Sequence, residues 1–299
     1  MKPVTKIAPL SLYDPRSGGL SLKIEPLHLP AGDSELPRTN YFTIYWVHEG
    51  HGLFVADFAG WGFQANSLLC LVPYQLSRIV SETPVRGTIV QFHANFFCIE
   101  AHHEEVGCNG VLFNNIYGVP IVDVGAAHVQ EFERLLGDMR RELAAGALAH
   151  AEVLVAYLKI FLVQATRLKL DQQTVSYQSA AKIPALLGKL QELLEMHFRT
   201  HHSPAFYAEM LTVAPKSLAR VIKSQLNKTL TELIRERIVK QAKWELLHTE
   251  KSVKQIALDL GFEDIFYFSR LFKRATGCPP SFFRDYELEI RSGRNPSML

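Results

Sequence analysis

The stretch SVKQIALDLGFEDIFYFSRLFKRATGCPP, residues 252–280, decides how the C-terminal part of this chain folds. Ser252 predicts a helix N-cap, because apolar residues follow it at helical spacing. Gly261 stands where a chain reversal needs a residue that tolerates positive φ. A second helix is predicted for residues 264–276, and Gly277 with the two prolines after it ends that helix. Two short helices joined by a tight turn are the helix-turn-helix pattern, whose second helix enters the DNA major groove.

The same stretch carries a family resemblance. Residues 261–284, GFEDIFYFSRLFKRATGCPPSFFR, resemble the C-terminal signature of the AraC-type transcription regulators. That signature contains a small residue, then Gly-Phe, Phe-x-Arg-x-Phe-Lys, Gly-x-x-Pro and an aromatic-Arg pair. The matching residues are Ala257, Gly261-Phe262, Phe268 to Lys273, Gly277 to Pro280 and Phe283-Arg284. The alternative is an amphipathic helix pair within an ordinary core.

Charge divides the chain into two unequal parts. From Lys182 to the C-terminus there are 19 Lys and Arg against 13 Asp and Glu, a net charge of +6. The totals of 32 and 30 leave 13 against 17 before that point, a net charge of −4. A modest basic excess at the C-terminus favours one DNA-binding domain and one domain of another kind.

The cysteines and the N-terminus indicate where the protein works. Cys70, Cys98, Cys108 and Cys278 form no CxxC pair, which argues against a disulfide framework and a zinc ribbon. Such isolated cysteines suit a reducing cytoplasm. No apolar signal-peptide region or membrane-spanning run is evident, so we expect a cytoplasmic protein with no membrane partner.

Residues 1–125 have the strand formers and breakers of an antiparallel β fold. Strand signals recur from Leu20 to Phe92 with turn residues between them, for example at residues 49–52, which predicts a sandwich or barrel. The AraC resemblance implies a cupin-like barrel that binds an effector. The residues expected to contact that effector are Tyr45, Trp46 and His93.

A group of metal-ligand types lies near the end of this domain. The group is His93, Cys98, Glu100, His102, His103, Glu104 and Cys108. Such side chains bind zinc or a similar ion. The spacing lacks the His-x-His set of cupin enzymes, however, and a polar loop is the favoured interpretation. We therefore expect no metal, no other cofactor and no catalytic residues.

Residues 126–170 read as an amphipathic helical hairpin, interrupted at Gly146. The resemblance implies dimerisation through this hairpin, and packing within one chain is the alternative. Residues 171–182 are polar and are expected to form an interdomain linker. The overall prediction is an α+β chain: a cupin-like β-barrel with a helical hairpin, then an all-α domain with two helix-turn-helix motifs over residues 183–290, and a tail at 291–299.

An earlier helix-turn-helix is predicted before a long helix over residues 229–248. Ser203-Pro204 predicts the start of its first helix, and residues 214–225 its second. It departs from the ideal in two places, because Thr212 occupies the positive-φ turn position and Ala214 the N-cap position. The long helix would be roughly 30 Å long, close to one helical repeat of DNA.

The resemblance and the helical spacing assign roles to individual residues. Those expected to read bases are Lys216, Ala219, Arg220, Ile265, Phe266, Ser269 and Arg270. Those expected to hold phosphates are Ser217, Lys223, Lys254, Lys273 and Arg274. Arginine holds guanine bidentately and apolar side chains press on thymine methyls, whereas phosphate contacts carry no sequence information.

These observations predict a sequence-specific DNA-binding transcription regulator, not an enzyme. We expect an effector-responsive activator that acts as a homodimer, with double-stranded DNA, an unidentified small molecule and RNA polymerase as partners. One alternative is a metal-dependent cupin enzyme fused to a helical module. The other is a regulator whose N-terminal domain only dimerises or binds protein.

Overall fold

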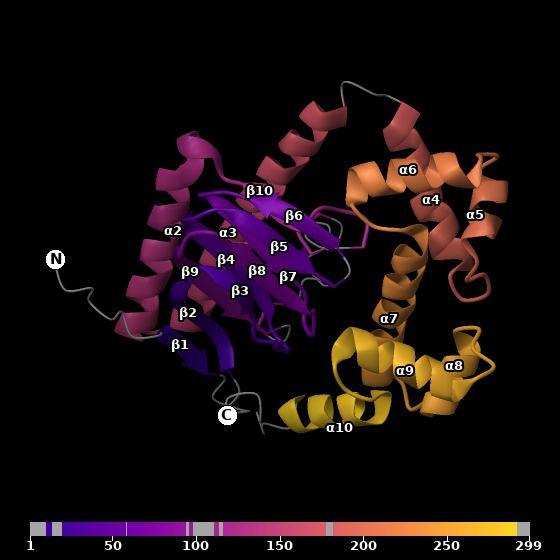
Figure 1. Ribbon diagram of the computed structural model, residues 1–299. Coiled ribbons are helices and arrows are strands. Elements are labelled where there is room, and N and C mark those ends of the chain that lie inside the picture. The colour runs from indigo at the N-terminus through magenta and orange to yellow at the C-terminus, as the bar shows by residue number, and fades with distance from the viewer. Residues whose placement is uncertain are drawn as a thin grey trace.

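The computed structural model describes residues 10–13, 20–57, 59–93, 96–97, 111–113, 116–177 and 182–291. These residues form two parts that lie side by side: a β-rich part with two covering helices, and an all-helical part (Figure 1). The α+β class and the order of the two parts agree with the prediction. Within these ranges no helix is long and apolar enough to cross a membrane.

The described strands form two antiparallel sheets. The larger sheet has the order β1-β2-β9-β4-β7-β10 and the smaller has β3-β8-β5-β6. The strands are β1 (Leu10–Tyr13), β2 (Leu20–Leu29), β3 (Gly32–Glu35), β4 (Phe42–Glu49), β5 (Gly52–Ala56), β6 (Ala59–Phe63), β7 (Ser67–Leu71), β8 (Ser77–Ser81), β9 (Val85–Phe92) and β10 (Ile121–Asp123). The predicted strands at residues 20–29 and 85–92 match β2 and β9.

Side chains of the larger sheet alternate between its two faces. Each face packs against its own hydrophobic core. On β4, Tyr45 and Val47 face the smaller sheet across one hydrophobic core, together with Phe54 of β5. Ile44 and Trp46 face the opposite way, into a second core beneath two helices. The described strands thus make a two-sheet sandwich, and the closed barrel of the prediction is not what their pairing shows.

Helices α2 (Gly125–Ala145) and α3 (His150–Tyr177) cover the outer face of the larger sheet. Gly146 ends α2 with φ 55°, as predicted for the break in the hairpin. Helix α3 continues to Tyr177, into the segment predicted as a linker. The side chain of Gln172 explains part of this extension, because it hydrogen-bonds both the amide and the carbonyl of Asp123 at the end of β10.

The all-helical part contains α4 (Lys182–His197), α5 (Pro204–Met210), α6 (Pro215–Leu226), α7 (Leu230–His248), α8 (Val253–Asp259), α9 (Ile265–Thr276) and α10 (Pro280–Arg291). Helix α7 begins with a capping box between Thr229 and Glu232, and it runs between the α5–α6 and α8–α9 pairs (Figure 1). Helix α10 ends at Arg291, and the rest of the predicted tail lies outside the described residues.

The two parts meet along α7 and its flanking residues. The amide of Asn227 donates to the carbonyl oxygen of Gly60. Lys228 is buried and its ammonium lies 2.6 Å from Glu236. Burial raises the pKa of Glu236 to about 7 although Lys228 opposes that shift. The ring of Tyr74, from the loop after β7, packs on Phe283 of α10 with centroids 4.7 Å apart.

Candidate DNA-binding surface

The first helical pair, α5 with α6, is joined by a short turn. The hydroxyl of Ser203 caps α5 by accepting from the amide of Ala205. Thr212 has φ 53°, the left-handed conformation expected at this position. Ala214 provides no side-chain hydrogen bond at the N-terminus of α6. Both departures inferred from the sequence are therefore present, and the turn still closes with a hydrogen bond from the amide of Val213 to the carbonyl oxygen of Ala208.

The second helical pair, α8 with α9, repeats this arrangement, with a glycine at the left-handed position and a side-chain cap on its second helix. Gly261 has φ 78°, which costs a glycine little. The amide of Phe262 donates to the carbonyl oxygen of Ala257, as Val213 does in the first pair. A carboxylate oxygen of Asp264 accepts from the amides of Phe266 and Tyr267 and caps α9. The second pair thus satisfies each local requirement of its turn.

The exposed face of α6 carries the residues predicted to contact DNA. Leu218, Ile222 and Leu226 are buried on the inner face of the helix. The exposed residues include Lys216, Ser217, Ala219, Arg220 and Lys223. The ammonium of Lys223 donates to the carbonyl oxygen of Asn227 at the end of its own helix. This face is therefore polar and basic, with Lys223 also stabilising the helix C-terminus.

The exposed face of α9 has a different character. Phe268 and Phe272 are buried, whereas Phe266 is 78% exposed. Ile265 and Ser269 are half-buried, and Arg270 is exposed with its guanidinium 3.8 Å from the carboxylate of Asp264. The face of α9 thus presents an exposed aromatic side chain near its N-terminus, which α6 does not.

The remaining predicted phosphate contacts lie around α9. Lys273 and Arg274 are exposed in its last turn, where positive charge also suits the helix dipole. Lys254 is exposed in the first turn of α8. Lys254, Lys273 and Arg274 are therefore all exposed on the second pair, as contacts to phosphate require.

Helix α9 has a second exposed aromatic residue, which the sequence pattern did not single out. Tyr267 is 45% exposed and neighbours Phe266 at the start of α9. It lies three residues before Arg270, so helical spacing places it on the same exposed face as that arginine. Counting three and four residues back from Arg270 was the signal that would have found it.

The residues predicted to contact an effector do not line one common space. Tyr45 faces the core between the sheets, where burial raises the pKa of its hydroxyl far above the usual value. Trp46 faces α2 and packs against Phe132. His93 is buried just after β9, with its ring edge-on to Tyr41 at 5.7 Å. The other residues of the predicted metal-ligand group lie outside the described ranges, and the described residues alone contain no cluster of three ligands.

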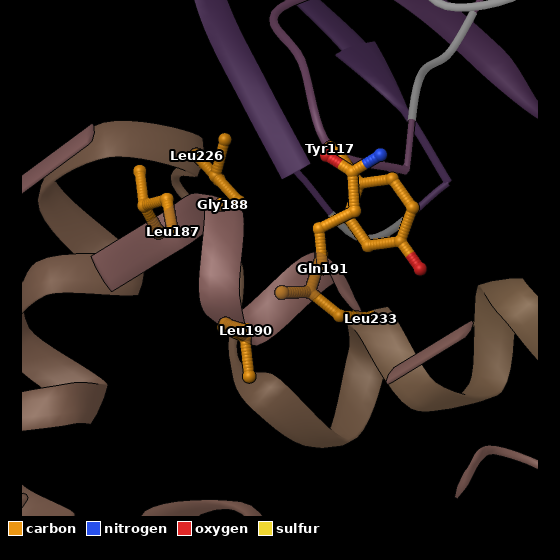
Figure 2. A pocket seen from close by; sticks show the side chains of 7 residues that line it. All are labelled: Tyr117, Leu187, Gly188, Leu190, Gln191, Leu226 and Leu233. Atoms are coloured by element: carbon orange, nitrogen blue, oxygen red, sulfur yellow. The ribbon is translucent and has the colours of Figure 1, made fainter. Parts of the chain in front are cut away.

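A cavity of about 200 Å³ lies between the two parts of the molecule (Figure 2). It is lined by Tyr117, Leu187, Gly188, Leu190, Gln191, Leu226 and Leu233. Tyr117 precedes β10 and belongs to the β-rich part, and its hydroxyl donates to Glu195 of α4. The cavity is therefore partly open, has a mixed polar and apolar lining, and includes residues from both parts of the chain.

Comparisons with known proteins match the helical part most clearly. A family model described as a helix-turn-helix domain matches residues 207–286. The arabinose operon regulatory protein of Salmonella typhimurium is 32% identical over 85 residues, which cover 28% of this chain and 30% of that protein. The transcriptional activator RhaS of Salmonella schwarzengrund is 27% identical over 175 residues, 58% of this chain and 57% of that protein. The match thus spans at most about half of these relatives' own length.

Solved structures of other proteins were compared with this chain as well. ToxT from Vibrio cholerae is 14% identical, with 89% of this chain and 98% of that chain covered and a TM-score of 0.39.

Proposed function

We propose that this chain, whose C-terminal domain is of the AraC type, is a sequence-specific DNA-binding regulator of transcription that places α6 and α9 in successive major grooves. The observation that carries the proposal is the exposure of the outer faces of both helices. Each helix is 12 residues long and buries its apolar face against a shared core. Of the proposed base-reading residues, Lys216, Ala219, Arg220, Phe266 and Arg270 are exposed on these two helices, and Ile265 and Ser269 are half-buried. Exposed side chains on such helices can reach base edges.

The spacing between the two helices supports this arrangement. Helix α7 has 19 residues and is therefore about 28 Å long. One turn of DNA is about 34 Å, so successive major grooves on one face are separated by nearly the same distance. A connector of this length lets one chain contact two short blocks of sequence about one helical turn apart.

Dimerisation through α3 is part of the proposal. Its inner face packs on the sheet and α2, whereas an outer stripe recurs every three and four residues. That stripe consists of Val153, Ala156, Ile160, Arg167 and Leu170, and Val163 between them is half-buried against the core. Val153, Ile160 and Leu170 are 36%, 44% and 45% exposed, and such spacing suits a seam with a second helix. Sedimentation of an Ile160→Glu variant tests this, since a charge in the seam should shift the protein toward monomer.

A response to a small-molecule effector is also proposed. Tyr45, Trp46 and His93 remain the residues proposed from the sequence, and the cavity between the two parts offers a second place. A ligand there would touch α4, α6 and α7 at once and would alter how the helical part sits on the sheets. Thermal stabilisation by members of a metabolite panel would identify a ligand. From the AraC resemblance we also propose that the protein activates transcription and contacts RNA polymerase. From the isolated cysteines we propose a cytoplasmic location.

Selection from a randomised duplex library tests the proposed function directly. The full-length protein is incubated with the library at two salt concentrations, and bound sequences are read out. We expect enrichment of two short blocks about one helical turn apart, and a repeat of that unit if a dimer binds. Binding without enrichment that vanishes at high salt would reduce the helical part to a non-specific basic surface and refute the proposal.

A further inference from the structure

In addition to its link to the first pair through α7, the second helical pair contacts the segment that precedes the first pair. The loop between α4 and α5 reaches the turn of the second pair at Gly261. A Cβ atom at Gly261 would lie 2.2 Å from the carbonyl oxygen of Arg199, so only glycine permits this approach. In the same loop, the ring of His202 packs on Phe262 with centroids 4.8 Å apart. The turn of the second pair is thus a contact surface for the first part of the helical domain.

A buried carboxylate ties this contact to α7. Glu245 of α7 is 1% exposed. One of its oxygens lies 3.0 Å from the guanidinium of Arg199, and the other lies 2.9 Å from the ammonium of Lys251. Gln241 of α7 also donates to Glu245, and Lys251 donates to Asp259 of α8 at 2.7 Å. Alternating charges therefore run from the α4–α5 loop through α7 to the second pair.

The charge on Glu245 is stabilised in this position. Burial by itself would raise the pKa of this carboxyl, but hydrogen bonds from Lys251, Gln241 and Arg199 leave the pKa below its ordinary value. A buried ion pair contributes little net stability but is costly to break on one side, because a charge is then left without a partner. Such a group is suited to fixing one arrangement of the elements around it.

Further contacts fix each end of α7 to its own helices. The guanidinium of Arg237 lies 3.9 Å from the centre of the Phe198 ring and binds both oxygens of Glu195 on α4. At the other end, Arg284 of α10 donates to the carbonyl oxygens of Leu246 and Lys251. The Glu245 contacts thus lie between two groups of helices that are each held firmly on α7.

We propose that the junction of Arg199, Glu245 and Lys251, with Gly261 packed on the Arg199 backbone, fixes the rotation of α9 relative to α6, so that the protein selects DNA sites by the distance between their two blocks. Arg199 and Glu245 are then positioning residues, which contact no base but set where the reading helices lie. This inference rests on the proposed function. It adds that specificity depends on spacing as well as on sequence.

The test measures binding of the full-length protein to the selected site with zero, one or two base pairs added or removed between the blocks. One base pair rotates the second block by about 35° and moves it by about 3.4 Å. We expect the wild type to lose about tenfold in affinity for each such change, the size of one lost base contact. Arg199→Met leaves Glu245 paired with Lys251. For this variant we expect a smaller loss, about threefold in affinity for each base pair of altered spacing.

Matched variants separate positioning from a general loss of charge. Lys189 is exposed on α4 outside the junction, so Lys189→Met removes the same charge and should keep the wild-type spacing profile. The double variant Arg199→Met with His202→Ala should flatten the profile further. A wild-type protein that binds the selected blocks equally at every spacing would overturn the inference but not the proposed function. An Arg199→Met profile identical to the wild type, with affinity lowered uniformly or not at all, would also overturn it. Failure to select any sequence would overturn the proposed function itself.

Discussion

The two helical pairs have the same geometry but different chemistry at the same places. Each has a helix of seven residues, a turn with one left-handed residue, and a helix of 12 residues. The left-handed residue is Thr212 in the first pair and Gly261 in the second. The side chain of Asp264 caps α9, whereas Ala214 provides no side-chain cap for α6. The second pair thus follows the local rules for its turn, and the first does not.

This difference teaches that the first pair depends more on its surroundings. A β-branched residue in the left-handed region is strained, so the contacts around Thr212 must hold it there. The amide of Thr212 donates to the carbonyl oxygen of Glu209, and the amide of Val213 donates to that of Ala208. The exposed faces differ as well, since α6 presents polar and basic residues and α9 presents Phe266 and Tyr267.

Gly261→Ala should produce the largest effect on this comparison. The new Cβ would meet the Arg199 carbonyl at 2.2 Å, and the residue would be held at positive φ. We expect a loss of about 2–4 kcal/mol in the stability of the second pair, combining left-handed strain with overpacking. Hydrogen exchange of the α8 and α9 amides measures the effect.

Gly188→Ala is the matched control for that experiment. Gly188 lies in α4, and a Cβ there would meet no atom within 4 Å. We expect unchanged or higher stability, since alanine favours a helix by about 1 kcal/mol over glycine. Equal effects of the two substitutions would show that the close approach of Arg199 to Gly261 is unimportant.

Arg270→Ala sharpens the comparison of the two exposed faces. We expect relaxed base preference at one position and a loss of about 1–3 kcal/mol in binding to the best site. Arg220→Ala should do the same at a position in the other block. Binding to a panel of single-base variants of the site measures both effects. Unchanged affinity and specificity would contradict the base-reading role of these arginines.

Lys273→Ala provides the contrast to the base-reading arginines. Lys273 is exposed in the last turn of α9, where we expect it to contact phosphate. Its loss should weaken binding to all sequences alike. The slope of the logarithm of the binding constant against the logarithm of the salt concentration should become shallower by about one. A change confined to one base position would refute that role.

Asp264→Ala tests whether capping distinguishes the two pairs. Its carboxylate accepts from two amides at 2.7 and 3.1 Å, and the loss of such a cap costs about 1 kcal/mol. Ala214→Ser should have the opposite sign, because Ala214 has a non-helical backbone, with φ −58° and ψ 133°, and lacks a side-chain acceptor. Thermal unfolding of the two variants compares them, and destabilisation by Ala214→Ser would contradict the interpretation of this position.

The sequence predicted best where local signals agree. In the second pair, Ser252, Gly261, Asp264 and Gly277 each act within a few residues of their own position, so the helix boundaries could be inferred. The strands were also located, since alternation is a local pattern. Whether the strands close into a barrel depends on pairings between distant residues, which alternation does not specify.

Long-range polar contacts were the features that the sequence did not reveal. Glu245 lies in the helix predicted over residues 229–248, but no local pattern indicates that it is buried and in contact with Arg199 and Lys251. The helical extension to Tyr177 depends on Gln172 meeting Asp123, and no local composition indicates that contact. The missed features thus share one cause, the pairing of polar groups that are brought together only by the fold.

The smallest expected effect comes from relieving the strain at Thr212. Left-handed conformation costs an ordinary residue about 1–2 kcal/mol, whereas glycine avoids that cost but gains freedom in the unfolded chain. Thr212→Gly also loses the hydrogen bond from the Thr212 hydroxyl to the Leu211 carbonyl oxygen, so we expect a net change of only a few tenths of a kcal/mol. Thr212→Asn tolerates the left-handed region without the glycine penalty, and should stabilise α5 and α6 more. Hydrogen exchange of these helices ranks the wild type, Thr212→Gly and Thr212→Asn by stability. If the wild type is the most stable of the three, the two turns differ in sequence but not in strain.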